Sequence, residues 1–96
     1  MYDNGRKHHG RHMLVFSLVR EGKPARLGIA ATRKLGMAVE RNRAKRRVRE
    51  LFRQHPAPAG FDIVVVPRRS LIDAPFTTLE AEYVATLARV RSGRPS

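Results

Sequence analysis

The chain has 96 residues, no cysteine, and 20 Lys and Arg against eight Asp and Glu, which leaves a formal charge of +12. This length fits one domain spanning residues 1–96, and the lack of cysteine excludes disulfides and thiolate metal sites and suits a reducing cytosol. A chain this basic repels itself, so a polyanionic partner is expected: RNA, DNA or an anionic membrane.

The N-terminal third is expected to hold a loop and two strands. Residues 1–11 are polar and basic and contain glycine, as loops do. Residues 12–19 (HMLVFSLV) are rich in branched and aromatic side chains and predict a strand. A turn with Gly and Pro follows at 20–24, and residues 26–32 (RLGIAAT) predict a second strand, expected to pair with the first as a hairpin.

The middle of the chain predicts a helix and a buried strand. After a basic loop at 33–36, residues 38–54 follow a helical pattern, which ends at the Pro- and Gly-containing stretch 55–60. Residues 61–67 (FDIVVVP) form a continuous β-branched run, which is typical of a buried strand.

A second helix is predicted over residues 76–91. Residues 77–80 (TTLE) match a capping box. Its apolar positions recur every four residues on one face: Leu79, Tyr83 and Leu87. The order strand, strand, helix, strand, helix predicts an α+β or mixed α/β two-layer sandwich, with helices packed on one sheet.

The helix at 38–54 would present an apolar stripe to the sheet and a cationic surface to solvent. At 100° per residue, one arc of about 100° holds Ala44, Val48, Leu51 and Phe52. A ridge on another side consists of Asn42, Arg46, Arg49 and Arg53, and the basic surface is extended by Arg41, Arg43, Lys45 and Arg47.

This cationic surface weakens the helix that carries it. Like charges stand four residues apart at 41/45, 43/47, 45/49 and 49/53, and each such pair costs a few tenths of a kcal/mol. A solvated charged face is the simplest alternative, but it would be expected to alternate in sign. Arg outnumbers Lys six to one in residues 41–53, which favours bidentate phosphate contacts and stacking on bases.

The sequence argues against a membrane or DNA as the partner and leaves one alternative role open. Membrane-surface binding by a basic amphipathic helix is not expected, because it needs large apolar residues on the opposite face with no competing core. The apolar runs at 13–16 and 63–66 are too short to span a membrane, and no signal peptide is visible. A DNA-recognition helix is disfavoured by the strand-rich order. A general RNA-binding or ribosomal-type protein without a processing role shares the charge and the fold class, and stays the alternative.

No active site is predicted on this chain. The eight carboxylates are scattered, whereas metal-dependent phosphodiester hydrolysis needs them clustered. The one histidine cluster, residues 8–12 (HHGRH), lies in the expected N-terminal loop, where catalytic or metal-binding side chains would lack a rigid shell.

Residues 27–53 (LGIAATRKLGMAVERNRAKRRVRELFR) strongly resemble the protein subunit of bacterial ribonuclease P. The later strand at 62–66 and the C-terminal helix fit the same pattern. The motif of that family is a Gly-containing strand, a basic stretch, a Gly, Ala-Val, and an Arg-Asn-Arg helix followed by Lys-Arg. It is matched in order by Gly28, Thr32-Arg33-Lys34, Gly36, Ala38-Val39, Arg41-Asn42-Arg43 and Lys45-Arg46.

The resemblance implies a fold, partners and a reaction. The fold would be a sandwich similar to the second domain of ribosomal protein S5, with a left-handed βαβ crossover that carries the basic helix. The chain would assemble with a catalytic RNA and bind the 5′ leader of precursor tRNA, whose removal leaves the mature 5′ end. The RNA would perform the chemistry and hold the Mg²⁺, so no catalytic residue, small-molecule cofactor or membrane is expected for this chain.

The resemblance also assigns site residues. RNA contacts are expected from Arg33, Lys34, Arg41, Asn42, Arg43, Lys45, Arg46, Arg49 and Arg53. A leader cleft is expected to include Tyr2, Phe16 and Thr32, because aromatic faces with nearby cations bind single strands without sequence preference. For Phe16, a place in the core is the alternative.

The chain departs from the family pattern at two kinds of position. Family members usually have a further helix, with another cleft aromatic, before the position of Tyr2, and this chain starts at Met1. Met37 stands where Asn is common, and Ala30-Ala31 replaces the usual Ser-Val.

Overall fold

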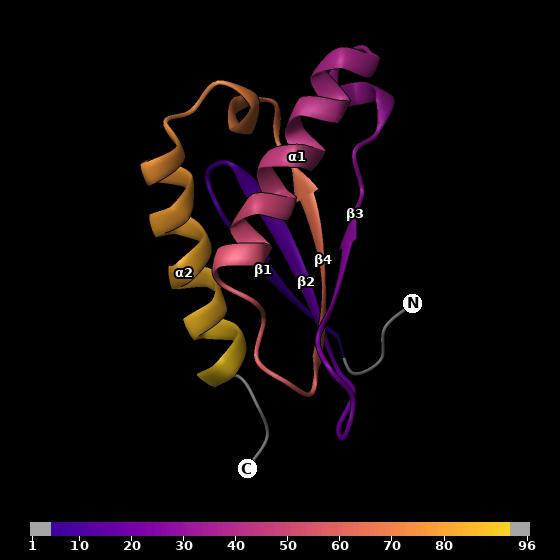
Figure 1. The fold of residues 1–96 in the computed structure, drawn as a ribbon, viewed down its shortest axis with the longest axis vertical. Coiled ribbons are helices and arrows are strands. Elements are labelled where there is room, and N and C mark those ends of the chain that lie inside the picture. The colour runs from indigo at the N-terminus through magenta and orange to yellow at the C-terminus, as the bar shows by residue number, and fades with distance from the viewer. Residues whose placement is uncertain (1–4, 93–96) are drawn as a thin grey trace.

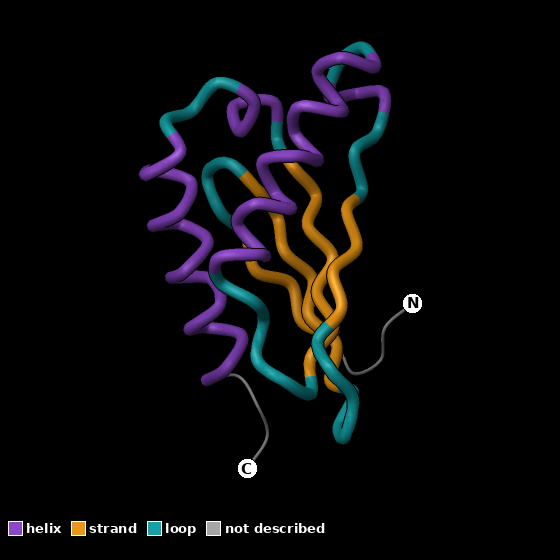
Figure 2. Tube along the Cα trace, in the orientation of Figure 1, coloured by secondary structure: helices purple, strands orange, loops and turns teal. Residues whose placement is uncertain are grey.

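The computed structural model describes residues 5–92, which form a four-stranded sheet covered on one face by two helices (Figures 1 and 2). The strands are β1 (Gly5–His9), β2 (Met13–Val19), β3 (Arg26–Ile29) and β4 (Phe61–Pro67). The helices are α1 (Ala38–Gln54) and α2 (Phe76–Ser92), with short 3-10 turns η1 (Arg33–Leu35) and η2 (Arg69–Ile72). The predicted helix at 38–54 and strand at 61–67 are confirmed, and the predicted α+β sandwich is confirmed with them.

The predicted hairpin between the first two strands is wrong. The strand order is β1-β2-β4-β3, so β4 lies between β2 and β3. β4 pairs antiparallel with β2 and parallel with β3. The continuous apolar run of β4 is best buried in the centre of the sheet, whereas β3, which carries Arg26 and Gly28, is better tolerated at an edge. β3 is also shorter than the predicted strand 26–32.

The β3–α1–β4 connection is the left-handed crossover that the family resemblance implies. Parallel neighbours cannot be joined by a tight turn, and α1 makes the connection across one face of the sheet. With the helices toward the viewer and both strands running upward, β4 lies to the left of β3 (Figure 1). Right-handed crossovers are the strong rule in proteins, so this hand is a distinctive feature of the fold.

Residues 5–9 form an edge strand, so the predicted loop at 1–11 is wrong over this stretch. β1 pairs antiparallel with β2 along its whole length, from Gly5 opposite Leu18 to His9 opposite Leu14. Its sequence, GRKHH, has no apolar alternation that would indicate a strand. Charged side chains are common on edge strands because they discourage pairing with another chain. Residues 5–9 therefore form a strand because the backbone of β2 offers them hydrogen-bond partners, and not because of their own sequence pattern.

The core lies between the sheet and the two helices. The inward side chains of β2 and β4 alternate with outward ones, as expected for strands with one face buried. The predicted buried faces of both helices are confirmed, because Ala44, Val48, Leu51, Leu79, Tyr83 and Leu87 all belong to the core. Neither described helix combines the length and apolar character needed to cross a membrane.

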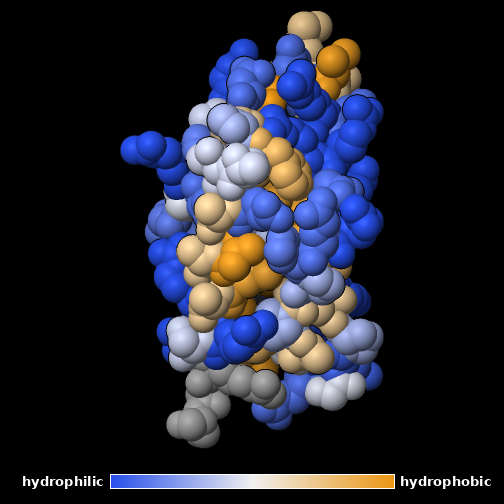
Figure 3. Space-filling model, turned by 60° about the vertical axis from the view of Figure 1, so that its left-hand side comes forward, coloured by the Kyte–Doolittle hydropathy of each residue, from blue (hydrophilic) through white to orange (hydrophobic). Residues whose placement is uncertain are grey.

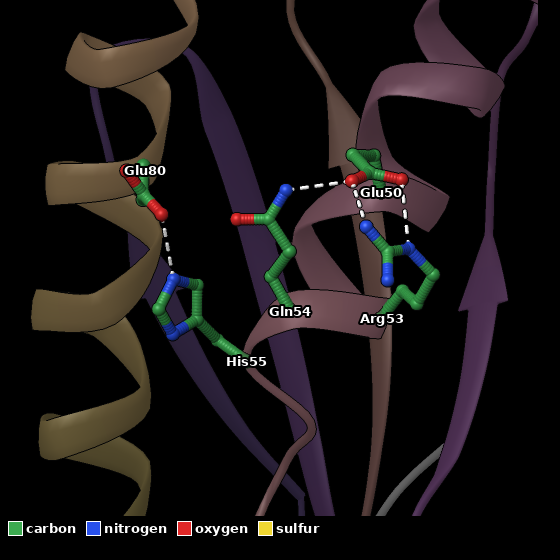
Figure 4. A network of polar contacts seen from close by, with 5 residues as sticks. All are labelled: Glu50, Arg53, Gln54, His55 and Glu80. Atoms are coloured by element: carbon green, nitrogen blue, oxygen red, sulfur yellow. Dashed lines mark hydrogen bonds and ion pairs between the residues drawn. The ribbon is translucent and has the colours of Figure 1, made fainter.

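The predicted capping box at 77–80 is wrong. α2 begins at Phe76, and the backbone N–H groups of Thr78 and Leu79 both donate to the carbonyl of Pro75, so the helix is already formed at residue 77. Glu80 instead turns toward the end of α1, where Oε2 lies 2.7 Å from Nε2 of His55 (Figure 4). The side chain that the pattern assigned to a local cap thus links the two helices.

Candidate nucleic-acid interface

The start of α1 is fixed by three polar contacts. The backbone N–H of Met37 donates to Oε1 of Glu40 at 2.8 Å, and Nη1 of Arg41 donates to the carbonyl of Gly36 at 3.0 Å. Nη1 of Arg69, from η2, donates to the carbonyl of Leu35 at 2.9 Å. Gly36 has φ +144°, and a Cβ there would lie 3.1 Å from the Cβ of Glu40, so this junction requires glycine. η1 and α1 are therefore held in one fixed arrangement.

The residues assigned to RNA contact lie along α1 and on η1, which directly precedes it. Arg41 and Lys45 are half-buried, and Arg41 is partly used to hold Gly36. The rest project into solvent: Arg33, Lys34, Asn42, Arg43, Arg46, Arg49 and Arg53. The structure thus places the predicted set along the whole length of α1 and on the turn that precedes it.

Six of these cations have no partner within residues 5–92. No ion pair or side-chain hydrogen bond joins them to another part of the described chain, whereas the carboxylates of Asp62, Glu50 and Glu80 are already engaged. The six are Arg33, Lys34, Arg43, Lys45, Arg46 and Arg49. Their positive charge is uncompensated on the protein and available to an external polyanion.

Arg53 differs from the other arginines of the ridge. It donates from Nε and Nη2 to the carboxylate of Glu50, which also accepts from Nε2 of Gln54 at 2.6 Å (Figure 4). The hydrogen bond from Arg53, with that from Gln54, lowers the pKa of Glu50 to about 2. Glu50 therefore already balances part of the charge of Arg53, which leaves less of that charge for an RNA phosphate.

Arg47 is a correction to the predicted cationic surface. Its guanidinium turns toward the protein and donates to the carbonyls of Ile72 and Ala74, in the segment between η2 and α2. Desolvation lowers the pKa of Arg47, with a further lowering from Arg43 and an opposing effect of Asp73. The helical wheel identified the cation but could not show that two backbone carbonyls lie within its reach.

Phe16 lies on the sheet face that the helices leave open. Its ring is half-buried and is not part of the core between sheet and helices, so the alternative of a core residue is not supported. Nζ of Lys7 lies 5.6 Å from the ring centroid, within cation–π range. The ring lines a hollow of about 380 Å³ together with Leu18, Arg26, Gly28, Asp62 and Val64, among others.

The other two predicted cleft residues are not joined to this hollow by the described structure. Thr32 is exposed at the start of η1 and is not among the residues that line the hollow. Tyr2 lies outside the described residues. Lys7, in contrast, was missed, because its stretch was assigned to a loop and only the pairing of β1 with β2 places it opposite Phe16.

The histidines of residues 8–12 do not form a common site. Nε2 of His8 lies 3.1 Å from Oγ of Ser17, while Nδ1 of His12 lies 2.8 Å from Oγ of Ser70. Desolvation lowers the pKa of His8, and the charges of Arg89 and Arg6 lower it further. Within residues 5–92, no three His, Asp or Glu side chains are grouped so that they could hold a metal ion.

Comparison with known proteins places this arrangement in a family. The family model described as Ribonuclease P matches residues 1–91. The ribonuclease P protein component of Oleidesulfovibrio alaskensis is 44% identical over 99% of this chain and 78% of its own length. That of Desulfovibrio desulfuricans is 40% identical over 98% of this chain and 77% of its own.

Solved structures give the same result for the fold. The ribonuclease P protein from Thermotoga maritima superposes with a TM-score of 0.80 at 36% identity, covering 88% of this chain and 83% of that one. The ribonuclease P protein from Staphylococcus aureus gives 0.75 at 31% identity, covering 90% and 81%.

Proposed function

The chain belongs to the ribonuclease P protein family, and we propose that it acts in that ribonucleoprotein by binding RNA phosphates along α1 and η1. The observation that carries the proposal is the group of six cations without a partner on this surface: Arg33, Lys34, Arg43, Lys45, Arg46 and Arg49. Each arginine that neutralises a phosphate releases condensed counterions, which drives association at moderate salt. The first partner is accordingly the ribonuclease P RNA.

The open sheet face supports a second contact, with the single-stranded 5′ leader of precursor tRNA. Phe16 offers a flat π-face on which an unpaired base can stack, and Lys7 places a cation beside that ring. Arg20 and Arg26 both pair with Asp62 at 3.0 Å, so two cations share one carboxylate and the charge beside the hollow stays positive. An unpaired base would thus stack on Phe16 of β2, and its phosphate would lie near Lys7 of the neighbouring strand β1.

The proposal assigns bond cleavage to the RNA subunit. This chain supplies no step of the endonucleolytic reaction, which would leave a 5′ phosphate on the mature tRNA. Mg²⁺, held mainly by RNA phosphates, would neutralise charge and activate the attacking water. The role of the protein is electrostatic, because its cations reduce the repulsion between the catalytic RNA and the precursor tRNA. The proposed location is the cytoplasm, where both RNAs are made.

Reconstitution tests this role directly. The cognate ribonuclease P RNA is incubated with precursor tRNA at low Mg²⁺, with and without the protein. Faster cleavage in the presence of the protein is expected, since added cations replace part of the Mg²⁺ requirement. Equal rates with and without the protein would contradict the proposal.

A substrate comparison tests the leader contact separately. The assembled enzyme should bind precursor tRNA more tightly than mature tRNA, and Phe16→Leu should narrow that difference while leaving the affinity for mature tRNA unchanged. Base–aromatic stacking contributes about 1–3 kcal/mol per base, or roughly fivefold to a hundredfold in affinity. Equal affinities for the two tRNAs would indicate a general RNA-binding protein instead.

A further inference from the structure

The N-cap and first turn of α1 hold two large apolar side chains in solvent. Met37 and Val39 are each 77% exposed. Among the large apolar residues of 5–92, only Val84 on α2 is also exposed, at 43%. Figure 3 shows hydrophobic colour at this end of the molecule among hydrophilic side chains, and a larger hydrophobic area further down the same face. Exposing apolar surface is unfavourable, so a partner that covered this pair would gain binding free energy.

This exposure does not arise from a loose turn. The backbone N–H of Met37 is bound by Glu40, and the preceding carbonyls of Leu35 and Gly36 are bound by Arg69 and Arg41. The backbone that carries the two apolar side chains is therefore held in place before any partner arrives. A partner would lose little binding free energy in ordering it.

Val39 forms one wall of a hollow of about 210 Å³ between α1 and η2. The other walls are Glu40, Arg43, Arg69, Ile72 and Asp73. This volume is smaller than the roughly 300–1,000 Å³ of pockets that enclose drug-sized ligands, so it suits a single flat ring. The hollow lies beside the cationic ridge, because Val39 stands three, four and seven residues before Asn42, Arg43 and Arg46 on the same helix.

The chemistry of the walls favours a base over a phosphate. The carboxylate of Asp73 makes no hydrogen bond or salt bridge within residues 5–92, although its charge acts on Arg47. With Glu40 it balances the charges of Arg43 and Arg69 in the walls, so the hollow has no excess positive charge for a phosphate. A carboxylate without a hydrogen-bond donor accepts hydrogen bonds from the amino groups of bases. The planar guanidinium of Arg43 can stack on a base, and Val39 adds apolar contact to its face.

We propose that an unpaired nucleobase of the ribonuclease P RNA, one with an amino group on its edge, docks in this hollow. The base lies against Val39 and Arg43 and donates to Asp73, while its flanking phosphates lie on the cations of η1 and α1. Met37 adds apolar surface two residues earlier. The inference rests on the proposed function and adds to it a specific contact, beyond the salt-dependent attraction of the ridge.

Two matched valine variants test the apolar contact. Val39→Ala and Val84→Ala remove the same two methyl groups from exposed positions of a helix, and both raise helix propensity, so the fold is kept. Affinity for the cognate ribonuclease P RNA is measured at several salt concentrations. Val39→Ala should bind about threefold to tenfold more weakly with an unchanged salt slope, and Val84→Ala should bind normally. Unchanged affinity of the Val39 variant would overturn the proposal.

Asp73→Ala decides between a base and a phosphate. Loss of an acceptor for a base weakens binding, whereas loss of a charge that repels a phosphate tightens it. Weaker binding supports the proposal, and equal or tighter binding overturns it. Circular dichroism and thermal unfolding confirm that each variant is folded.

The variant Arg46→Ala distinguishes failure of the base contact from failure of the proposed phosphate-binding function. If Arg46→Ala weakens RNA binding and Val39→Ala does not, the base contact is wrong and the phosphate-binding role stands. If neither variant changes the affinity, both proposals fail.

Discussion

Arg46 and Arg47 are neighbours on one helix, yet their guanidinium groups face different partners. Arg46 projects into solvent with no partner in the described part of the chain, while Arg47 donates to two backbone carbonyls. Arg53 is intermediate, since it is exposed but paired with Glu50. The three residues have the same chemistry, so the difference in their expected roles comes from what each can reach.

Substitution of the exposed arginines should reduce the salt dependence of RNA binding. Arg46→Ala and Arg49→Ala should each lower the log–log slope of affinity against salt by a little under one, because each loses about one phosphate contact. Arg53→Ala should lower the slope less, since the guanidinium of Arg53 is already paired with Glu50 and is less available to a phosphate. The measurement is RNA affinity over a salt series, and an unchanged slope for Arg46 and Arg49 would place them outside the interface.

Substitution of Arg47 should act on stability instead. Arg47→Ala leaves the carbonyls of Ile72 and Ala74 without their donor, at a cost of about 1–3 kcal/mol in the free energy of unfolding. Denaturant unfolding measures this loss, with Arg46→Ala as the matched control on the same helix. A salt slope that falls as much as it does for Arg46→Ala would show that Arg47 binds RNA after all.

At the scale of elements, α1 carries the candidate interface and the rest of the fold holds it in place. Arg69 of η2 and Glu40 fix its start, Arg47 ties its middle to the segment before α2, and His55 beyond its end contacts Glu80 of α2. These contacts oppose the repulsion between like charges along the helix. The cationic ridge is thus stabilised by tertiary contacts on the other sides of the helix.

His8 of β1, which lies near Arg89 of α2, should make the stability of the fold depend on pH. The pKa of His8 is lowered from its ordinary value of 6.5 by desolvation and by the charges of Arg89 and Arg6, so the folded state disfavours the protonated ring. The contribution of His8 is therefore fully present above about pH 6.5 and is lost as the pH falls below it.

Urea unfolding at about pH 7.5 and about pH 5.5 measures this effect. His8→Gln can still hydrogen-bond Ser17 but does not titrate, so it should lose less stability on acidification than the unaltered protein. The other histidines are common to both proteins, and their contribution cancels in the comparison. Equal losses in the two proteins would show that His8 is not responsible.

At the scale of the whole molecule, the formal charge of +12 has opposite consequences for folding and for binding. Self-repulsion destabilises the compact state, and salt screens it. The same salt competes with the protein for RNA phosphates. The net positive charge therefore lowers the stability of the free chain and raises its affinity for RNA.

Raising NaCl from about 50 to about 200 mM should increase the free energy of unfolding of the free protein and weaken its RNA binding by orders of magnitude. Thermal unfolding and RNA affinity are measured in the same buffers. A protein of balanced charge and similar size serves as the control for general salt effects. If stability fell with added salt, self-repulsion would not be a significant cost of this composition.

The sequence by itself determined the features that depend on near neighbours. The bounds of α1, its buried stripe, the cationic ridge and the buried run of β4 all follow from patterns within a few residues, because helical and strand periodicity is local. The ordered motif at 27–53 also led correctly to the family. These features need no knowledge of which segment lies beside which.

Only the tertiary structure decided which strands pair and where individual side chains point. β4 separates β2 from β3, and β1 exists because the backbone of β2 offers it partners. Arg47 and Glu80 leave their expected roles because distant carbonyls and a distant histidine lie within reach. Hydrogen bonds between segments far apart in the chain depend on strand order and register, and neither is contained in the periodicity of one segment.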